Sequence, residues 1–181
     1  MVRPLSGNAP SVLGRRRALG IAALVSAGCV FVVAPWAAGF GSVVIRDRVG
    51  DVRSADLDLV HVTITRTRAT ITATFVVAGQ IRDNVSYAVF LTGEKRQLIG
   101  VWAERSHGKA SFYALDPATF RSFDVRGSLA GRIATVSAPL AALRLSRTEL
   151  VHASVMSGGL HKRKAESDHA ALFPVAVPPS R

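Results

Sequence analysis

The most constraining feature of this 181-residue chain is a run of residues without a charged side chain, from Ala18 to Phe40. Three arginines, Arg15 to Arg17, directly precede it. A basic segment followed by a long apolar segment is typical of an export signal or a membrane anchor. As a helix rising about 1.5 Å per residue, this run is long enough to cross a hydrocarbon core of roughly 30 Å. We therefore predict that the rest of the chain is secreted or is anchored on the extracytoplasmic face of a membrane.

The end of this segment favours cleavage, with retention and lipidation left open. Pro35 breaks a helix, and the small residues Ala37 to Gly39 follow it, as a signal peptidase requires. We expect cleavage between Ala38 and Gly41, and without it the segment would be a transmembrane anchor. Ser26-Ala27-Gly28-Cys29 looks like a lipobox, although the chain stays apolar after it. Arg16-Arg17 loosely resembles a twin-arginine signal.

The remaining length predicts one domain and a tail. We assign residues 1–41 to the signal or anchor, 42–160 to one folded domain, and 161–181 to a polar tail with a possible edge strand. Cys29 is the only cysteine, so a chain cleaved after it can form neither a disulfide nor a thiolate metal site. The domain must then be held together by its own apolar packing.

The charge beyond the leader is strongly basic, with 19 basic against 12 acidic residues, a net +7. Such a charge can indicate nucleic acid as a partner, but export argues against that partner. Carbohydrate or an anionic cell-wall polymer is the better expectation, and an ordinary solvated surface is the plainest alternative. The chain has no Gly-x-Ser-x-Gly nucleophile motif, no phosphate-binding glycine loop and no histidine pair with zinc spacing. We therefore predict that the protein is not an enzyme.

The domain alternates between apolar and polar residues with a period of two, which predicts β-strands. In 58–65 the core face is expected to carry Val60, Val62 and Ile64, with Leu59 facing solvent. A polar turn at 66–68 joins this strand to 71–77, which predicts a hairpin. Further strands are expected at 85–91, 98–105, 109–115, 120–125, 133–138, 150–156 and 172–177, with a single helical turn at 140–143. This pattern predicts an all-β, antiparallel β-sandwich of jelly-roll or immunoglobulin-like type.

Four aspartates form the candidate metal site: Asp47, Asp51, Asp56 and Asp58. Four like charges within twelve residues repel one another unless a cation or a nearby arginine compensates them. Calcium prefers hard oxygen ligands such as carboxylates supplied by a loop, and Gly50 would allow the necessary sharp turn. Arginines interleave with the aspartates, so surface salt bridges and turn-capping aspartates are the alternative.

The same segment carries a resemblance to a known class of domain. Asp47-Arg48-Val49-Gly50-Asp51-Val52, then Ala55-Asp56-Leu57-Asp58-Leu59-Val60, resembles the opening of secreted bacterial DOMON-like and carbohydrate-binding-module-like β-sandwich domains. Residues 63–72 are similar to their first long hairpin, and the resemblance covers about residues 43–87. It implies a sandwich that binds a sugar or another ligand. No residue matches the axial histidine or methionine of the haem-binding relatives.

Trp102 is the candidate ligand-binding residue. It shares strand parity with Leu98, Gly100 and Glu104, whereas the opposite parity at 99, 101 and 103 is apolar and suits a core. An exposed indole can stack on the apolar face of a sugar ring. The plainer expectation is a tryptophan in the sandwich core. The sequence thus predicts a non-catalytic, exported ligand-binding sandwich, or else a structural or protein-interaction protein of the cell envelope without a small-molecule site.

Overall fold

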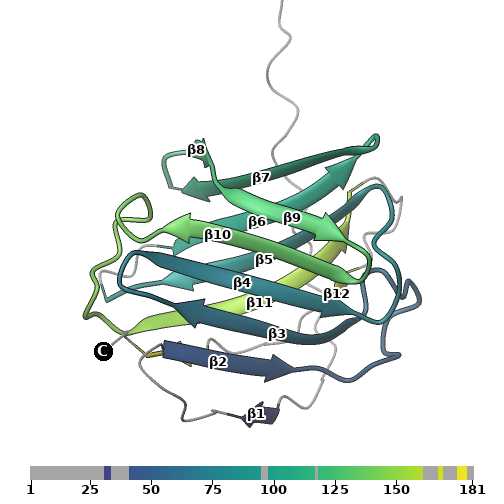
Figure 1. The fold of residues 1–181 in the computed structure, drawn as a ribbon, viewed down its shortest axis with the longest axis horizontal. Coiled ribbons are helices and arrows are strands. Elements are labelled where there is room, and N and C mark those ends of the chain that lie inside the picture. The colour runs from purple at the N-terminus through teal and green to yellow at the C-terminus, as the bar shows by residue number, and fades with distance from the viewer. Residues whose placement is uncertain are drawn as a thin grey trace, which may run out of the picture.

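The computed structural model describes residues 31–33, 41–94, 98–116, 118–160, 167–168 and 175–178. These residues form strands, turns and loops, arranged as two antiparallel sheets packed face to face (Figure 1). The predicted all-β, antiparallel sandwich is confirmed.

The first sheet, here called sheet A, has six strands. Their spatial order is β1 (Phe31–Val33), β2 (Gly41–Arg46), β3 (Leu59–Arg66), β4 (Thr70–Val77), β10 (Ile133–Pro139) and β9 (Arg126–Ala130). Each pair of neighbours is antiparallel. The chain therefore leaves the sheet after β4 and returns to it through β9 and β10.

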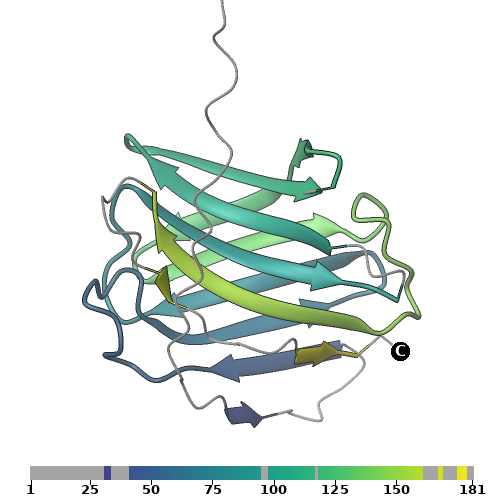
Figure 2. The same cartoon turned by 180° about the vertical axis from the view of Figure 1, so that it is seen from behind.

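The second sheet, sheet B, has seven strands and faces the viewer in Figure 2. Their spatial order is β12 (Ser167–Asp168), β11 (Val151–Gly159), β5 (Val85–Thr92), β6 (Leu98–Ser106), β7 (Lys109–Asp116) and β8 (Arg121–Asp124), with β13 (Val175–Val177) also paired to β11. All of these pairings are antiparallel. The chain passes from sheet B to sheet A between β8 and β9, so one edge of the sandwich is closed by a covalent crossing.

The core lies between the sheets and follows directly from the period of two. On sheet B the inward positions of β5 alternate with outward ones, so Val85, Tyr87 and Val89 are buried. On sheet A the residues Ile71, Ala73 and Phe75 of β4 are buried in the same way. Burying apolar surface contributes roughly 25 cal/mol per Å². In a domain without a disulfide this core is the main source of stability.

The first predicted hairpin is confirmed, but its first strand contains a local shift. The pairing of β3 with β4 is irregular between Leu59 and His61. Leu59 is fully buried and Val60 only partly, contrary to our expectation that Val60 faces the core and Leu59 the solvent. A β-bulge inserts one extra residue and reverses the parity on one side of it. From Val62 onward the expected parity holds.

The connection after Pro139 consists of hydrogen-bonded turns. The Leu143 N–H donates to the Pro139 carbonyl at 3.2 Å, which is the i to i−4 bond of the single helical turn expected at 140–143. The strands β1, β2, β9 and β12 were not expected, and β1 is a correction, because Phe31–Val33 lies in the segment predicted as a signal or anchor helix. The strand Gly41–Arg46 was missed because its apolar residues directly continue the apolar run of the leader. The strand β9 was missed because it is mostly exposed and lacks a strong apolar alternation.

Most of the predicted leader lies outside the described residues. Of residues 1–41, the structure describes Phe31–Val33, a short strand paired with β2, and Gly41, the first residue of β2. Within the described parts of the chain we find no helix of the length and hydropathy needed to cross a bilayer. Of the tail 161–181, β12 and β13 are described, and both pair with β11.

Candidate functional site

The loop between β2 and β3, residues 47–58, is held in place from several sides. Gly50 has a φ of 92°, a conformation that glycine adopts without steric strain. The N–H of Asp47 donates to the carbonyl of Val60 at 3.1 Å, and the Leu57 carbonyl accepts from the Ser157 hydroxyl of β11. Because these bonds come from both sheets, the loop has a defined shape at one end of the sandwich.

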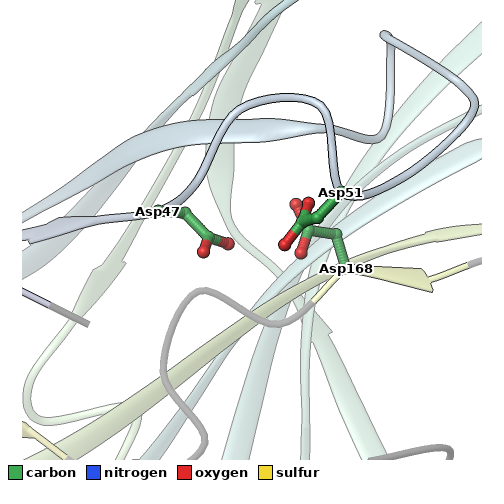
Figure 3. Close-up of side chains that lie close together, drawn as sticks. All are labelled: Asp47, Asp51 and Asp168. Atoms are coloured by element: carbon green, nitrogen blue, oxygen red, sulfur yellow. The ribbon is translucent and has the colours of Figure 1, made fainter. Parts of the chain in front are cut away.

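Three carboxylates converge beside this loop (Figure 3). Asp47 and Asp51 belong to the loop itself, and Asp168 comes from β12 in the tail. One carboxylate oxygen from each of these residues lies within 4.8 Å of the other two. Asp47 is partly buried, Asp51 exposed and Asp168 buried, so the group opens to solvent on the Asp51 side.

Asp168 connects the two sheets. Its Oδ2 accepts a hydrogen bond from the Leu59 N–H of β3 at 2.7 Å, while its own strand pairs with β11 of sheet B. Burial raises the pKa of Asp168 to about 7, aided by the charges of Asp47 and Asp51 and opposed by the Leu59 hydrogen bond. The folded protein therefore holds this carboxyl in an environment that disfavours its charge.

The surroundings of Asp47 also disfavour the charged form of its carboxyl. Burial raises its pKa, the charges of Asp51 and Asp58 add to the effect, and the Arg48 N–H donated to its Oδ1 at 2.8 Å opposes it. Its Oδ2 is buried and accepts no hydrogen bond from the described residues. Among those residues, we also find no arginine or lysine paired with Asp47, Asp51 or Asp168. The salt bridges considered as the alternative to a metal site are thus not formed within the described part of the chain.

The other two predicted ligands, Asp56 and Asp58, lie outside the group of three. Asp58 is 3% exposed, and its Oδ2 accepts the Gly50 N–H at 2.8 Å. Burial and the charge of Asp51 raise the pKa of Asp58. Asp56 contributes its backbone carbonyl, which accepts the Tyr87 hydroxyl. The structure therefore joins two of the four predicted aspartates to Asp168.

Trp102 lies on the outer face of sheet B, as its strand parity indicates. It is partly exposed, whereas its neighbours Val101 and Ala103 are buried in the core. In the register of β6 with β7 it stands opposite Tyr113, and the two rings are nearly parallel, at 12°, with centroids 5.4 Å apart. Phe90 of β5 meets the indole edge-on, at 86° and 5.4 Å. Three neighbouring strands thus place three aromatic rings in contact, and we call this set the aromatic row.

The position of the indole depends on Gly100. Gly100 lies directly opposite Phe90 in the register, and a Cβ atom on it would come within 1.9 Å of the Trp102 ring. The missing side chain lets the indole lean over the strand toward Phe90. Glu104 borders the row, accepting the Tyr113 hydroxyl at 2.7 Å and the Ser86 hydroxyl at 3.2 Å. The arrangement offers flat apolar ring surface with hydrogen-bonding groups beside it.

Asp168 and the partners of Trp102 were missed from the sequence. Asp168 is more than a hundred positions from Asp47, and its neighbours in the chain are polar, so no spacing rule connects the two. Tyr113 and Phe90 could have been found, because both have the outward parity of their strands and stand at paired positions of neighbouring hairpins.

The fold defines the chain as an antiparallel β-sandwich protein. Comparison with known protein families, with curated proteins and with solved structures finds no match to it. The resemblance of residues 43–87 to DOMON-like and carbohydrate-binding-module-like domains therefore stays a prediction from sequence.

Proposed function

We propose that this protein is an exported, non-catalytic β-sandwich that binds carbohydrate, either free or within a cell-envelope polymer, on the outer face of sheet B. The observation that carries the proposal is the aromatic row, in which Trp102 faces outward in contact with Tyr113 and Phe90. The core does not need these rings, because inward residues of the same strands already fill it.

The chemistry of the row suits sugar rings. Aromatic faces carry a large apolar surface at low conformational cost, and a pyranose ring presents C–H groups on one face and hydroxyls at its edge. The Glu104 carboxylate and the Ser86 hydroxyl lie where such edge hydroxyls can bond. Because Glu104 is acidic, we assign neutral sugar rings to this face. An anionic polymer would be held by the net +7 charge elsewhere on the surface.

Tryptophan fluorescence provides the test. The chain has two tryptophans, so a Trp36→Phe background leaves Trp102 as the only indole. This variant is titrated with hexamers of N-acetylglucosamine, glucose and xylose, and it is also sedimented with purified insoluble peptidoglycan. We expect saturable quenching or a blue shift with at least one probe, and cosedimentation that is lost in Trp102→Ala.

A matched aromatic substitution serves as the control. Phe120 is 75% exposed, lies in the turn before β8 and makes none of the ring contacts of the aromatic row, so Phe120→Ala should bind like the wild type. Failure of every probe to alter the fluorescence or to sediment the protein would contradict the proposal. Equal binding by Trp102→Ala would move the site away from the row.

A structural or protein-interaction role in the envelope is the second candidate. It is favoured by Phe120 itself, since a large apolar side chain with a φ of 54° at 75% exposure gains nothing within the monomer. Cross-linking of the full chain in intact cells, with Phe120→Ala as the comparison, tests it. Loss of a protein cross-link in Phe120→Ala with unchanged sugar binding would favour this role.

A further inference from the structure

A cation site at the end of the sandwich is independent of the aromatic row. We propose that Asp47, Asp51 and Asp168 bind one Ca²⁺ ion, and that this ion fastens β12 of sheet B to the loop that leads into β3 of sheet A. The three carboxylate oxygens are already gathered within 4.8 Å of one another (Figure 3).

The three side chains bring up to three negative charges together, and within the described residues none of them has a cationic partner. Two backbone N–H groups, those of Arg48 and Leu59, donate to the group. Asp47 and Asp168 also share a side-chain hydrogen bond, which needs a proton on one of the two carboxyls. Like charges held this close destabilise the fold unless protons or a cation neutralise them.

A fourth carboxylate, that of Asp58, lies beside the group. The Asp58 side chain is 3% exposed, its Oδ2 accepts the Gly50 N–H, and its charge interacts with those of Asp47 and Asp51. Its Oδ1 is buried and has no hydrogen-bond partner in the described structure. A buried carboxylate oxygen without a partner is costly in a native protein, and a cation bound by the neighbouring three aspartates would offset that cost through its charge.

The ligand chemistry favours calcium over magnesium. All three side chains offer hard carboxylate oxygens from a loop and a short strand, and Mg²⁺ demands a near-ideal octahedron that such a set does not prearrange. Calcium also takes six to eight oxygens, and the exposed Asp51 side leaves room for water to complete the shell.

The ion would cross-link two parts of the chain that are far apart in sequence, the loop 47–58 and β12. Asp168 already bonds to Leu59 of sheet A while its strand pairs with Ser157 and Gly158 of sheet B. A shared cation would turn the repulsion between this residue and the loop into attraction. Calcium is then a structural ion whose removal loosens the tail from the sandwich.

Calorimetric titration of the full chain, freed of metal with EGTA and dialysed, tests the site. We expect one Ca²⁺ per chain with a Kd on the order of 0.1–1 mM, the range of extracellular modules, and weaker binding of Mg²⁺. At calcium a hundredfold above Kd, the melting temperature should rise by roughly 5–10 °C relative to EGTA.

Three variants separate the proposed ligand set from the four aspartates predicted from sequence. Asp168→Asn and Asp51→Asn should each weaken calcium binding at least tenfold and remove most of the rise in melting temperature. Asp56→Asn, the matched control, should bind like the wild type because its carboxylate lies outside the group. Asp51 is exposed, so its variant is expected to fold even if Asp168→Asn does not.

The proposal is overturned if millimolar calcium produces no heat and no thermal shift in the wild type. It is equally overturned if Asp51→Asn and Asp168→Asn bind as the wild type does, or if Asp56→Asn alone abolishes binding. Sugar binding measured in EGTA keeps this result separate from the fate of the aromatic row.

Discussion

The two sheets bury similar inner faces but present different chemistry to solvent. On sheet A, register places a row of hydroxyl side chains across four neighbouring strands, namely Thr63, Thr74, Thr135 and Ser128. On sheet B the corresponding central positions carry the aromatic row of Phe90, Trp102 and Tyr113. Small hydroxyl side chains suit a pleated, solvated surface, whereas outward aromatic rings leave apolar surface in water. The contrast teaches that packing fixes the inner faces and leaves the outer faces open to function.

The apolar inner face of sheet A also contains a buried cation. Arg66 is fully buried, and its guanidinium donates to the Glu149 carbonyl at 2.7 Å and to the Ser146 carbonyl at 2.5 Å. Burial lowers the pKa of Arg66, and the nearby Glu149 carboxylate opposes that effect. The side chain ties the last residue of β3 to the loop before β11.

We expect Arg66→Ala to have the largest effect on stability. The two carbonyls would lose a charged donor and the Glu149 carboxylate a nearby positive charge, at a cost of about 3 kcal/mol in the free energy of unfolding. Urea denaturation followed by circular dichroism measures this loss. An outward arginine of the same sheet, Arg46→Ala, is the control and should change stability by less than about 0.5 kcal/mol. Equal effects of the two variants would remove the distinction between the faces.

Asp168, which links β12 of sheet B to β3 of sheet A, should make the stability of the protein depend on pH. The folded pKa of Asp168 is raised to about 7, and that of an unfolded aspartate is 3.8. The resulting stabilisation is therefore complete below pH 4 and is lost as the pH rises through 7. Allowing for solvent screening, we expect a loss of about 2 kcal/mol between these values in metal-free protein.

Melting curves recorded in EGTA from pH 4 to 8 check this dependence. Asp168→Asn should flatten the pH profile, since an amide can still accept the Leu59 N–H but does not ionise. Asp56→Asn should retain the wild-type profile. An unchanged profile in Asp168→Asn would show that other groups cause the dependence.

Gly100→Ala tests whether the outer face of sheet B is more sensitive to substitution than the outer face of sheet A. The added Cβ would meet the Trp102 ring at 1.9 Å, so the indole must move and the contact with Phe90 must break. We expect a loss of about 1–2 kcal/mol, together with weaker sugar binding. Thr135→Val, on the hydroxyl row of sheet A, is the matched control and should stay within about 0.5 kcal/mol. Chemical denaturation and the fluorescence titration measure both effects.

The smallest effect is expected when a tyrosine hydroxyl is removed. Tyr87 lies in the core, and its hydroxyl donates to the Asp56 carbonyl, so Tyr87→Phe should cost about 1 kcal/mol. Tyr113 is partly exposed and water can replace its bond to Glu104, so Tyr113→Phe should cost less than half of that. A larger loss for Tyr113→Phe in denaturation curves would contradict our assignment of inner and outer faces.

The strand pattern was predictable because alternation is a local property. The hairpin of β3 and β4, the hairpin of β6 and β7, and the outward position of Trp102 all follow from the period of two. The bulge between Leu59 and His61 was missed, because inserting one residue leaves no mark in the composition. Arg66 was expected in a polar turn, since nothing near it in sequence indicates the carbonyls of Ser146 and Glu149 that receive it.

In the candidate sites, too, the sequence predicted the local features and missed the long-range contacts. By itself the sequence determined an all-β domain and pointed to Trp102 and to four aspartates, Asp47, Asp51, Asp56 and Asp58. Side-chain periodicity and charge density can be recognised within a short segment. Only the tertiary structure decided that Asp168 lies beside Asp47 and Asp51, and that Trp102 meets Phe90 and Tyr113. Strand order and register determine such contacts, and they depend on the free energy of the whole packed core, which no short segment contains.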